Sequence, residues 1–551
     1  MPESPVDDEG EMPAASDAPP MESETIPGRY GLRQRIGLVL GVVLFVGTLV
    51  MPTPAGMSLE AKRAAAVGLL MAAWWISQAL PIPAVALLPL VLYPALKIMG
   101  AKRAAAPYAN HNIYLFMGGF FIAMAMQKWG LHRRIALHVI RILGTNPRLV
   151  ILGFMVATAL ISMWISDTAT TMMMVPIAMA VIAQVVGIER ARQPSSQWPT
   201  VHANFAAALV LCIAHSSVIG GVGTLIGTPP NIIFAGQFGA GADTQFPGAD
   251  PVAFSQWMLC GIPVVVLFLP LCWLWITRIG IPVRLERIPG GREVIRRELA
   301  QLGRMNRGER ITLVVFLLAV AAWMFRAEID LGGVVIPGWA DRLGVEQWGT
   351  SSGAENGVAD STVAIAAGLL LFMLPVNLRK SEFVLDWQTA ARLPWGILIL
   401  FGGGFALAAS FEATGLSAWL GGILGRLEGA PPLLMIACTC LLLTFLTEVT
   451  SNTATASIMM PILGATAVSM GIHPFLLMMP AAMSASCAFM LPVATPPNAI
   501  VFGTGYLNIP EMCRTGIGLN LIGVVIITAV TYFITVPVFG IDVQALPTWA
   551  H

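Results

Sequence analysis

Long apolar segments constrain this chain more than any other feature of its sequence. A membrane-spanning helix needs roughly 20 predominantly apolar residues. Ten stretches are clear candidates for such helices: 35–52, 63–80, 148–166, 204–220, 256–277, 311–327, 362–377, 431–447, 474–491 and 514–538. Of the 551 residues, 56% are hydrophobic and only 11% are charged, a surplus that one water-soluble core cannot bury. The sequence therefore predicts an all-α polytopic membrane protein.

Further apolar stretches are shorter or interrupted by Gly or Pro. They cover residues 82–98, 110–127, 168–187, 395–412 and 453–471. The total is too high for simple spans alone, so we expect some of these stretches to be half-helices or re-entrant hairpins.

Basic residues predict the sidedness, because Lys and Arg gather on the cytoplasmic side. Arginines precede the first span, which places the N-terminus in the cytoplasm. Residues 278–310 hold nine Arg against four Glu, which predicts a cytoplasmic connecting segment with an amphipathic surface helix; binding of anionic lipid or a partner is an alternative role. Residues 328–361 hold six acids and one base and should lie outside.

The connecting segment 278–310 separates two halves, residues 35–277 and 311–540. Residues 541–551 form a C-terminal tail. The first 28 residues hold eight acids and no Lys or Arg, so we expect residues 1–34 to be a disordered acidic cytoplasmic tail and not a signal peptide.

Three sequence blocks recur in the same order in the two halves. Two block pairs lie 285 residues apart and the third 267 residues apart: LFMGGFFIAMAMQKWGL (115–131) with LFGGGFALAASFEATGL (400–416), SDTATTMMMVP (166–176) with SNTATASIMMP (451–461), and GTPPNIIF (227–234) with ATPPNAIVF (494–502). With the predicted sidedness, equivalent blocks enter from opposite faces, which indicates the inverted repeats typical of secondary transporters.

Polar triplets occur in both halves where one apolar helix stops and another begins. They are Ser166-Asp167-Thr168 and Ser451-Asn452-Thr453. Polar groups are costly inside a membrane and usually mark function there. Their oxygens suit a cation such as Na⁺, and the N–H groups of the following helix suit a carboxylate.

The paired TPPN motifs complement these triplets. Proline breaks a helix and has no N–H, so upstream carbonyls are available to a cation, and Thr228 and Thr495 can offer hydroxyls to a substrate. Ser162 and Thr447 precede the triplets by one helical turn and are expected on the same face as Ser166 and Ser451, as extra cation ligands. Glu448 and His215, beside these motifs, are expected to be structural hydrogen-bond partners, with a proton relay as the alternative.

The paired triplets, TPPN turns and GG-containing blocks together resemble the divalent anion/sodium symporter family, over about residues 35 to 540. The resemblance implies a homodimer with about eleven transmembrane helices and two re-entrant hairpins per chain, near 110–130 and 395–415. It also implies transport domains that move by an elevator mechanism.

The resemblance further implies site residues. One sodium site would involve Ser162, Ser166, Asp167 and Gly227, and a second Thr447, Thr450, Asn452 and Ala494. The substrate would contact Asp167, Thr168, Thr228, Ser451, Asn452, Thr453 and Thr495.

Asp167 departs from the family pattern, which has Asn at this position. An ionised Asp offers acceptors only and would repel a substrate carboxylate unless a cation lay between them. Asp167 could bind Na⁺ more firmly, carry a proton that couples transport to H⁺, or indicate a different substrate. We favour the first, because the remaining cation ligands are intact.

These observations predict sodium-coupled symport of a C4-dicarboxylate such as succinate, malate or fumarate. A sulfate or citrate carrier, a proton-coupled carrier and an anion exchanger of the same fold are alternatives. Scattered histidines without a nucleophile or metal motif argue against an enzyme. A net charge of +1 argues against a nucleic-acid partner. We expect lipid and a small anion as partners, Na⁺ but no cofactor, and a bacterial inner-membrane location.

Overall fold

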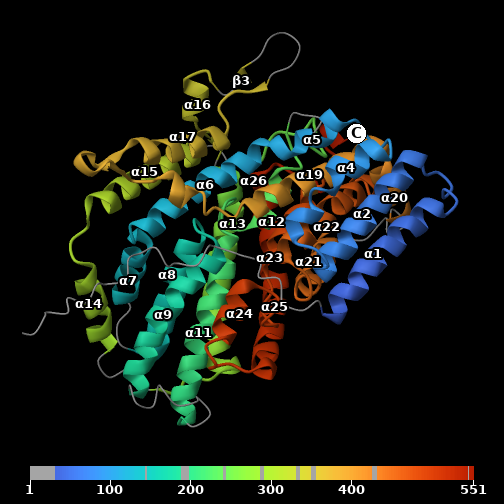
Figure 1. Cartoon of the computed structure of the whole chain (residues 1–551). Coiled ribbons are helices and arrows are strands. Elements are labelled where there is room, and N and C mark those ends of the chain that lie inside the picture. Colours follow the sequence, from blue (N-terminus) through green and yellow to red (C-terminus); the bar gives the residue numbers. More distant parts are fainter. Residues whose placement is uncertain are drawn as a thin grey trace, which may run out of the picture.

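The computed structural model describes most of the chain as helices (Figure 1). The described residues are 31–142, 146–187, 198–239, 244–285, 291–330, 335–345, 347–348, 355–424, 431–543 and 545–550. The predicted acidic tail therefore lies almost wholly outside the described residues. The described residues are mostly helical, in agreement with the predicted helical fold.

The first half contains helices α1 to α13. Their bounds are α1 Leu32–Val50, α2 Leu59–Ser77, α3 Ile82–Val85, α4 Leu88–Ala95, α5 Ala101–Ala105, α6 His111–Lys128, α7 Leu131–Ile142, α8 Pro147–Ser162, α9 Asp167–Val186, α11 Thr200–Gly221, α12 Pro229–Ala235 and α13 Phe254–Leu274. A π-helical turn, Trp275–Gly280, prolongs α13.

The connecting segment contains α14, Gly291–Leu302, and the second half continues to α26. The bounds are α15 Arg307–Met324, α16 Trp339–Arg342, α17 Asp360–Met373, α18 Trp387–Ala390, α19 Trp395–Thr414, α20 Leu416–Leu424, α21 Pro432–Thr447, α22 Asn452–Ser469, α23 Phe475–Ser486, α24 Pro496–Phe502, α25 Ile509–Val530 and α26 Val536–Val538. Thr531–Thr535 forms a second π-helical turn between α25 and α26.

Short antiparallel strand pairs occur only in the connections of the described second half. They are β1 Ile329–Asp330 with β2 Val335–Ile336, β3 Gln347–Trp348 with β4 Glu355–Asn356, and β5 Pro375–Asn377 with β6 Glu382–Phe383.

The helices carry apolar side chains outward and bury hydroxyl and amide groups. Val43 on α1, Leu267 on α13 and Val525 on α25 are exposed, whereas Ser217 and Asn498 are fully buried. This arrangement is the opposite of a water-soluble protein and fits a lipid environment. Within the described ranges, six helical stretches are long and apolar enough to cross a membrane: Leu32–Val50, Asp167–Val186, Thr200–Gly221, Phe254–Gly280, Trp395–Thr414 and Ile509–Val538.

The two halves interlock through equivalent helices. In the first half α11 packs against α8 and α9, and in the second half α23 packs against α21 and α22. The short helix α12 crosses to pack on α22 and α23, while its counterpart α24 packs on α9 and α11. Each TPPN helix therefore rests on the opposite half.

The predicted hairpins near 110–130 and 395–415 are wrong. Each range is occupied by one continuous helix, α6 or α19. Their glycines serve close helix packing: a Cβ on Gly118 would lie 2.4 Å from the Ala364 backbone of α17, and one on Gly403 would lie 2.6 Å from Ala86 O. The helix–turn–helix pairs are instead α8–α9 and α21–α22, with the polar triplets at their tips.

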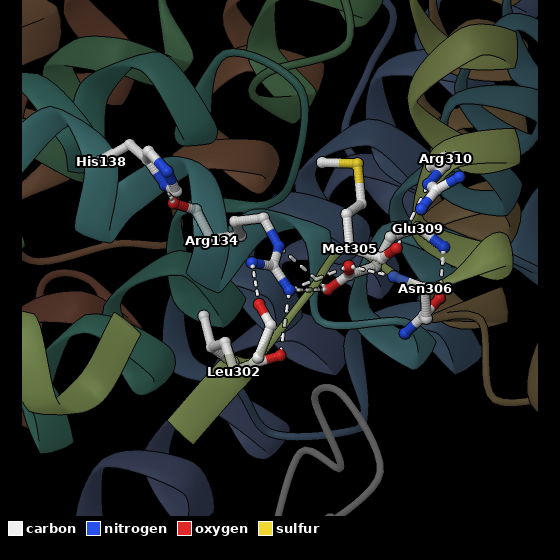
Figure 2. Close-up of polar contacts among 8 residues, drawn as sticks. Arg134, His138, Leu302, Met305, Asn306, Glu309 and Arg310 are labelled. Atoms are coloured by element: carbon white, nitrogen blue, oxygen red, sulfur yellow. Dashed lines mark hydrogen bonds and ion pairs between the residues drawn. The ribbon is translucent and has the colours of Figure 1, made fainter. Parts of the chain in front are cut away.

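A buried ion pair ties the connecting segment to α7. Arg134 contacts Glu309 at 3.0 Å and donates to the carbonyls of Leu302 and Gly303, at 3.1 and 3.0 Å. Glu309 also caps α15 through Asn306. Figure 2 shows this cluster, in which the Arg134 guanidinium points between the end of α14 and the start of α15.

Candidate functional site

The first polar triplet lies at a break between two helices. Ser166 is the N-cap of α9, where its Oγ accepts from Ala169 N at 3.3 Å. Ser162 is the last residue of α8, and its Oγ donates to Ser217 O of α11 at 2.6 Å. The expectation that Ser162 and Ser166 share one face of a continuous helix is therefore wrong, because the chain turns between them.

Asp167 is the first residue of α9. Its Oδ1 accepts from the backbone N–H of Thr168 at 2.7 Å and from the Thr168 hydroxyl at 3.2 Å. A carboxylate at this position lies at the positive end of the helix dipole. No hydrogen bond joins Asp167 to the second triplet within the described chain.

The second triplet is built in the same way, with α21 ending at Thr447 and Ser451 as the N-cap of α22. Thr447 Oγ1 lies 2.6 Å from Asn452 Oδ1 and 2.7 Å from Ala485 O. A hydroxyl has one proton and can donate to only one of these oxygens at a time. Three oxygens thus gather at this tip with fewer protons than acceptors.

Of the remaining hydroxyls at this tip, that of Thr450 is hydrogen-bonded within the protein and those of Ser451 and Thr453 are not, as far as the described residues show. Thr450 Oγ1 lies 2.8 Å from Leu446 O and 2.5 Å from Thr455 Oγ1. The hydroxyls of Ser451 and Thr453 make no hydrogen bond to any part of the chain that the structure describes. These two hydroxyls can bind a ligand without losing a protein partner.

Asn231 and Asn498 hold the TPPN loops in the same manner. Asn231 Nδ2 donates to Gly221 O and Thr224 O at 3.1 and 2.7 Å. Asn498 Nδ2 donates to the carbonyls ten and seven residues before it, Ala488 O and Leu491 O, both at 3.1 Å. No role was predicted for these two asparagines, although they recur at the same position of both TPPN motifs.

Backbone approach at the first TPPN loop requires glycine. A Cβ on Gly227 would lie 2.3 Å from Gly221 O, so no side chain fits there. At the second loop Ala494 N donates to Leu491 O at 3.2 Å. Thr495 is the N-cap of α24, where its Oγ1 accepts from Asn498 N at 3.3 Å. Because the hydroxyl acts as the acceptor in this bond, its own proton can still be donated to another group.

The two halves meet at Ser486, the last residue of α23. Its hydroxyl lies 3.3 Å from Thr228 Oγ1 of the first half, and its carbonyl accepts from Asn452 Nδ2 at 3.4 Å. Thr228, Asn452 and Thr447 therefore form one chain of contacts across the halves. Ser486 was not predicted as a site residue, although its hydroxyl sits one short loop before the TPPN motif.

Glu448 clamps the loop that leads into the second TPPN motif. Its Oε1 accepts from Phe489 N and Met490 N at 2.7 and 2.9 Å and from Asn520 Nδ2 at 2.8 Å, and its Oε2 accepts from Leu491 N at 3.1 Å. The prediction of a structural hydrogen-bond partner is confirmed for Glu448.

The same prediction is wrong for His215. Neither of its ring nitrogens has a hydrogen-bond partner among the described residues. Its fully buried ring instead packs edge-on against Phe489, with ring centroids 5.0 Å apart.

Both helix-pair tips touch elements outside the pairs at equivalent positions. Trp164 packs against Phe316 and Trp323 of α15, with ring centroids 5.1 and 6.5 Å away. At the position 285 residues later, Val449 O accepts from Arg33 Nη2 of α1 at 2.9 Å. The loops that carry the two triplets are thus held by α15 and α1.

Comparison with known proteins places these features in a family. Residues 32–539 match the sequence profile of the sodium:sulfate symporter transmembrane region. The chain is 42% identical to the sodium-dependent dicarboxylate transporters SdcS of Staphylococcus saprophyticus, over 94% of this chain and 95% of that protein, and of Staphylococcus aureus strain RF122, over 94% of each.

Solved structures agree on the fold at low sequence identity. MtrF of Neisseria gonorrhoeae superposes with a TM-score of 0.54 at 11% identity, covering 95% of this chain and 98% of MtrF. The YdaH transporter of Alcanivorax borkumensis gives 0.50 at 13% identity, covering 92% and 97%. The family resemblance seen in the repeated motifs is confirmed: the chain is a membrane transporter, not an enzyme, and belongs to the sodium:sulfate symporter family.

Proposed function

We propose that this protein is a sodium-coupled symporter of a C4-dicarboxylate. The observation that carries the proposal is the line of contacts from Thr228 through Ser486 to Asn452, which joins both repeated motifs in one site. The names of the SdcS relatives support sodium as the coupling ion and a dicarboxylate as the substrate.

We propose one sodium site at each of the two tips. We assign Ser162, Ser166, Asp167 and Gly227 to the first site, and Thr447, Thr450, Asn452 and Ala494 to the second. At the second tip, Asn452 Oδ1 and Ala485 O both lie within hydrogen-bond distance of Thr447 Oγ1. A cation among them would satisfy oxygens that the single threonine proton cannot.

Asp167 gives the first sodium site a full negative charge. Its Oδ1 is engaged by Thr168, so Oδ2 is the oxygen we assign to sodium. With Na⁺ bound, the local charge is neutral and a substrate carboxylate is no longer repelled. This order, cation before dianion, makes sodium a requirement for substrate binding.

The substrate site lies between the two tips and the two TPPN helices. We assign it Asp167, Thr168, Thr228, Ser451, Asn452, Thr453 and Thr495. Ser451 and Thr453 bring hydroxyls that are not used within the described chain, and α9 and α22 begin there with N–H groups suited to a carboxylate. Hydroxyl and amide donors without a lysine or arginine suit a substrate that arrives with its own cations.

The architecture we propose corrects the earlier placement of the hairpins. The pairs α8–α9 and α21–α22 are the re-entrant hairpins of two inverted repeats, within about eleven transmembrane helices. The hairpins move with α11–α13 and α23–α25 as the transport unit of an elevator, against α1, α2, α6, α15, α17 and α19. We further propose a homodimer in a bacterial inner membrane with a cytoplasmic N-terminus.

Uptake of labelled succinate into proteoliposomes tests the proposal. An inward Na⁺ gradient should drive accumulation, whereas an inward H⁺ gradient without Na⁺ should not. Uptake only under the H⁺ gradient would make Asp167 a proton carrier, and uptake only into succinate-preloaded vesicles would mark an exchanger. No succinate uptake in any arm would contradict the dicarboxylate assignment, and sulfate and citrate would be tested next.

A further inference from the structure

The connecting segment presents a surface rich in exposed arginine. We call this the arginine surface and define it by the exposed residues Arg296, Arg297, Arg304, Arg307 and Arg310 on α14, the following turn and the start of α15. Arginine side chains at such positions keep their charge at any physiological pH.

The three acids of this segment that the structure describes do not neutralise this surface. Glu309 is buried against Arg134, and Glu298 pairs with Arg133 of α7. Figure 2 shows Glu309 turned toward Arg134, whereas Arg310 donates through Nε to Met305 O at 3.2 Å and pairs with no acid in the described part of the chain. Glu293 approaches Arg296 at only 3.8 Å, with both side chains 76% exposed, a geometry that contributes little.

Arg297, Arg304, Arg307 and Arg310 therefore have no acidic partner among the described residues. The two inward-facing glutamates are used to fix α7, and the surface keeps a surplus of positive charge. A surface of this kind fits an anionic partner.

The chain itself carries a complementary segment. Residues 1–28 contain eight acids and no base, namely Glu3, Asp7, Asp8, Glu9, Glu11, Asp17, Glu22 and Glu24. Fully extended, a segment of 28 residues spans up to about 95 Å. The whole chain of 551 residues, when compact, has a radius of gyration of about 24 Å. Reach therefore does not limit contact, and tethering raises the effective concentration of the segment at the surface.

We propose that residues 1–28 dock on the arginine surface. The inference rests on the proposed orientation, in which both segments are cytoplasmic. Exposed ion pairs are individually weak and are screened by salt, so the docking is reversible and depends on ionic strength. Anionic lipid headgroups would compete for the same guanidinium groups.

Zero-length crosslinking tests the contact. The variant Arg297→Lys/Arg304→Lys keeps the charge and introduces amines that a carbodiimide joins only to carboxylates in direct contact. Native Lys380 is also exposed. It lies one predicted span, 362–377, after the outside segment 328–361 and is therefore expected in the cytoplasm, so it is the internal control. The matched control variant replaces all eight tail acids with Asn or Gln.

In neutral detergent at low salt, peptides joining the tail to positions 297 or 304 should exceed those joining it to Lys380 at least fivefold. They should disappear in 0.5 M salt. Equal crosslinking to Lys380, or none at positions 297 and 304, would overturn the proposal. So would loss of these crosslinks when the full-length protein is placed in phosphatidylglycerol vesicles, because lipid would then occupy the arginine surface. The acid-neutralised protein should give no tail crosslink in either setting, and crosslinks that persist in it would show that the partner is not the tail.

Succinate uptake measured on the same variants keeps the two proposals separate. Crosslinking without sodium-driven uptake would leave the docking intact and contradict the proposed transport function. Sodium-driven uptake without crosslinking would support the transport function and contradict the docking of residues 1–28.

Discussion

At the scale of single residues, Asp167 distinguishes this chain from its own second repeat. The equivalent residue is Asn452, whose amide can both donate and accept, whereas an ionised carboxylate only accepts. The structure places Asp167 at the start of α9 with Oδ1 engaged by Thr168. A carboxylate in this position favours a cation nearby, so the two tips should differ in how firmly they hold sodium.

Asp167→Asn should therefore keep succinate transport and weaken the apparent sodium affinity by about tenfold, or ~1.4 kcal/mol. The sodium dependence of initial uptake rates at fixed succinate measures this. Asp250→Asn, at an exposed loop position, is the matched control. An unchanged sodium dependence in Asp167→Asn would show that Asp167 is not a sodium ligand.

Glu448 holds the backbone of residues 489–491, which leads into the proposed second sodium site. Glu448→Gln replaces one carboxylate oxygen with an amide that cannot accept from the N–H groups of residues 489–491. Hydrogen bonds to a charged group contribute about 1.5–3 kcal/mol each, so the variant should weaken apparent sodium affinity at least tenfold. Glu511→Gln, at the partly buried start of α25 and outside the loop that Glu448 contacts, should leave it unchanged, and equal effects in both variants would contradict a positioning role.

At the scale of elements, the site depends on where helices end rather than on where they run. The triplets cap α9 and α22, and the TPPN motifs begin α12 and α24. The polar residues and prolines at these positions predicted the helix ends from the sequence. The glycine-rich blocks looked like turns but form continuous helices, because Gly118 and Gly403 allow neighbouring backbones to approach. Sequence pattern does not distinguish these two uses of glycine, since the partner that approaches is distant in the chain.

The asparagine clamps of the TPPN loops are the element-scale prediction. Asn231→Ala and Asn498→Ala each release two carbonyls that lie beside the proposed sodium sites. An unsatisfied buried group costs about 1–3 kcal/mol, so each variant should weaken sodium-dependent uptake by about tenfold or more.

The control for the clamps is Asn204→Ala, which removes a bond to Pro282 O at 3.1 Å outside the loops. Sodium titrations of uptake and thermal stability in detergent should be measured for all three variants. Equal loss of uptake in all three would indicate general destabilisation and contradict a specific role for the clamps.

At the scale of the whole molecule, the sequence predicted the repeated motifs and the family. It did not predict how the two halves pack into each other. Paired motifs at fixed separations identified equivalent residues, and the helix ranges agree closely with the apolar stretches. That α12 rests on α22 and α23 while α24 rests on α9 and α11 depends on packing between halves. Ser486 was not predicted as a site residue because its role also depends on packing between the halves: its partners Thr228 and Asn452 come from different halves.

Elevator movement predicts that a link between the transport unit and its support stops transport. In Trp164→Cys/Trp323→Cys, a short reagent that joins two thiols should reduce uptake at least tenfold, with recovery after reduction. The ring centroids of this pair lie 6.5 Å apart. The control Trp164→Cys/Phe254→Cys spans a similar 6.2 Å within the proposed transport unit and should stay active when joined. Continued uptake by the first joined pair would contradict the elevator proposal.

The coupling of sodium to the dicarboxylate is tested most directly by equilibrium binding. The dissociation constant for succinate should be measured by titration calorimetry on purified protein, across a series of sodium concentrations with choline as the replacement ion. The proposed order predicts that succinate affinity rises steeply with sodium, and that succinate raises sodium affinity by the same factor, because coupling free energies are reciprocal. A succinate dissociation constant independent of sodium would contradict the account.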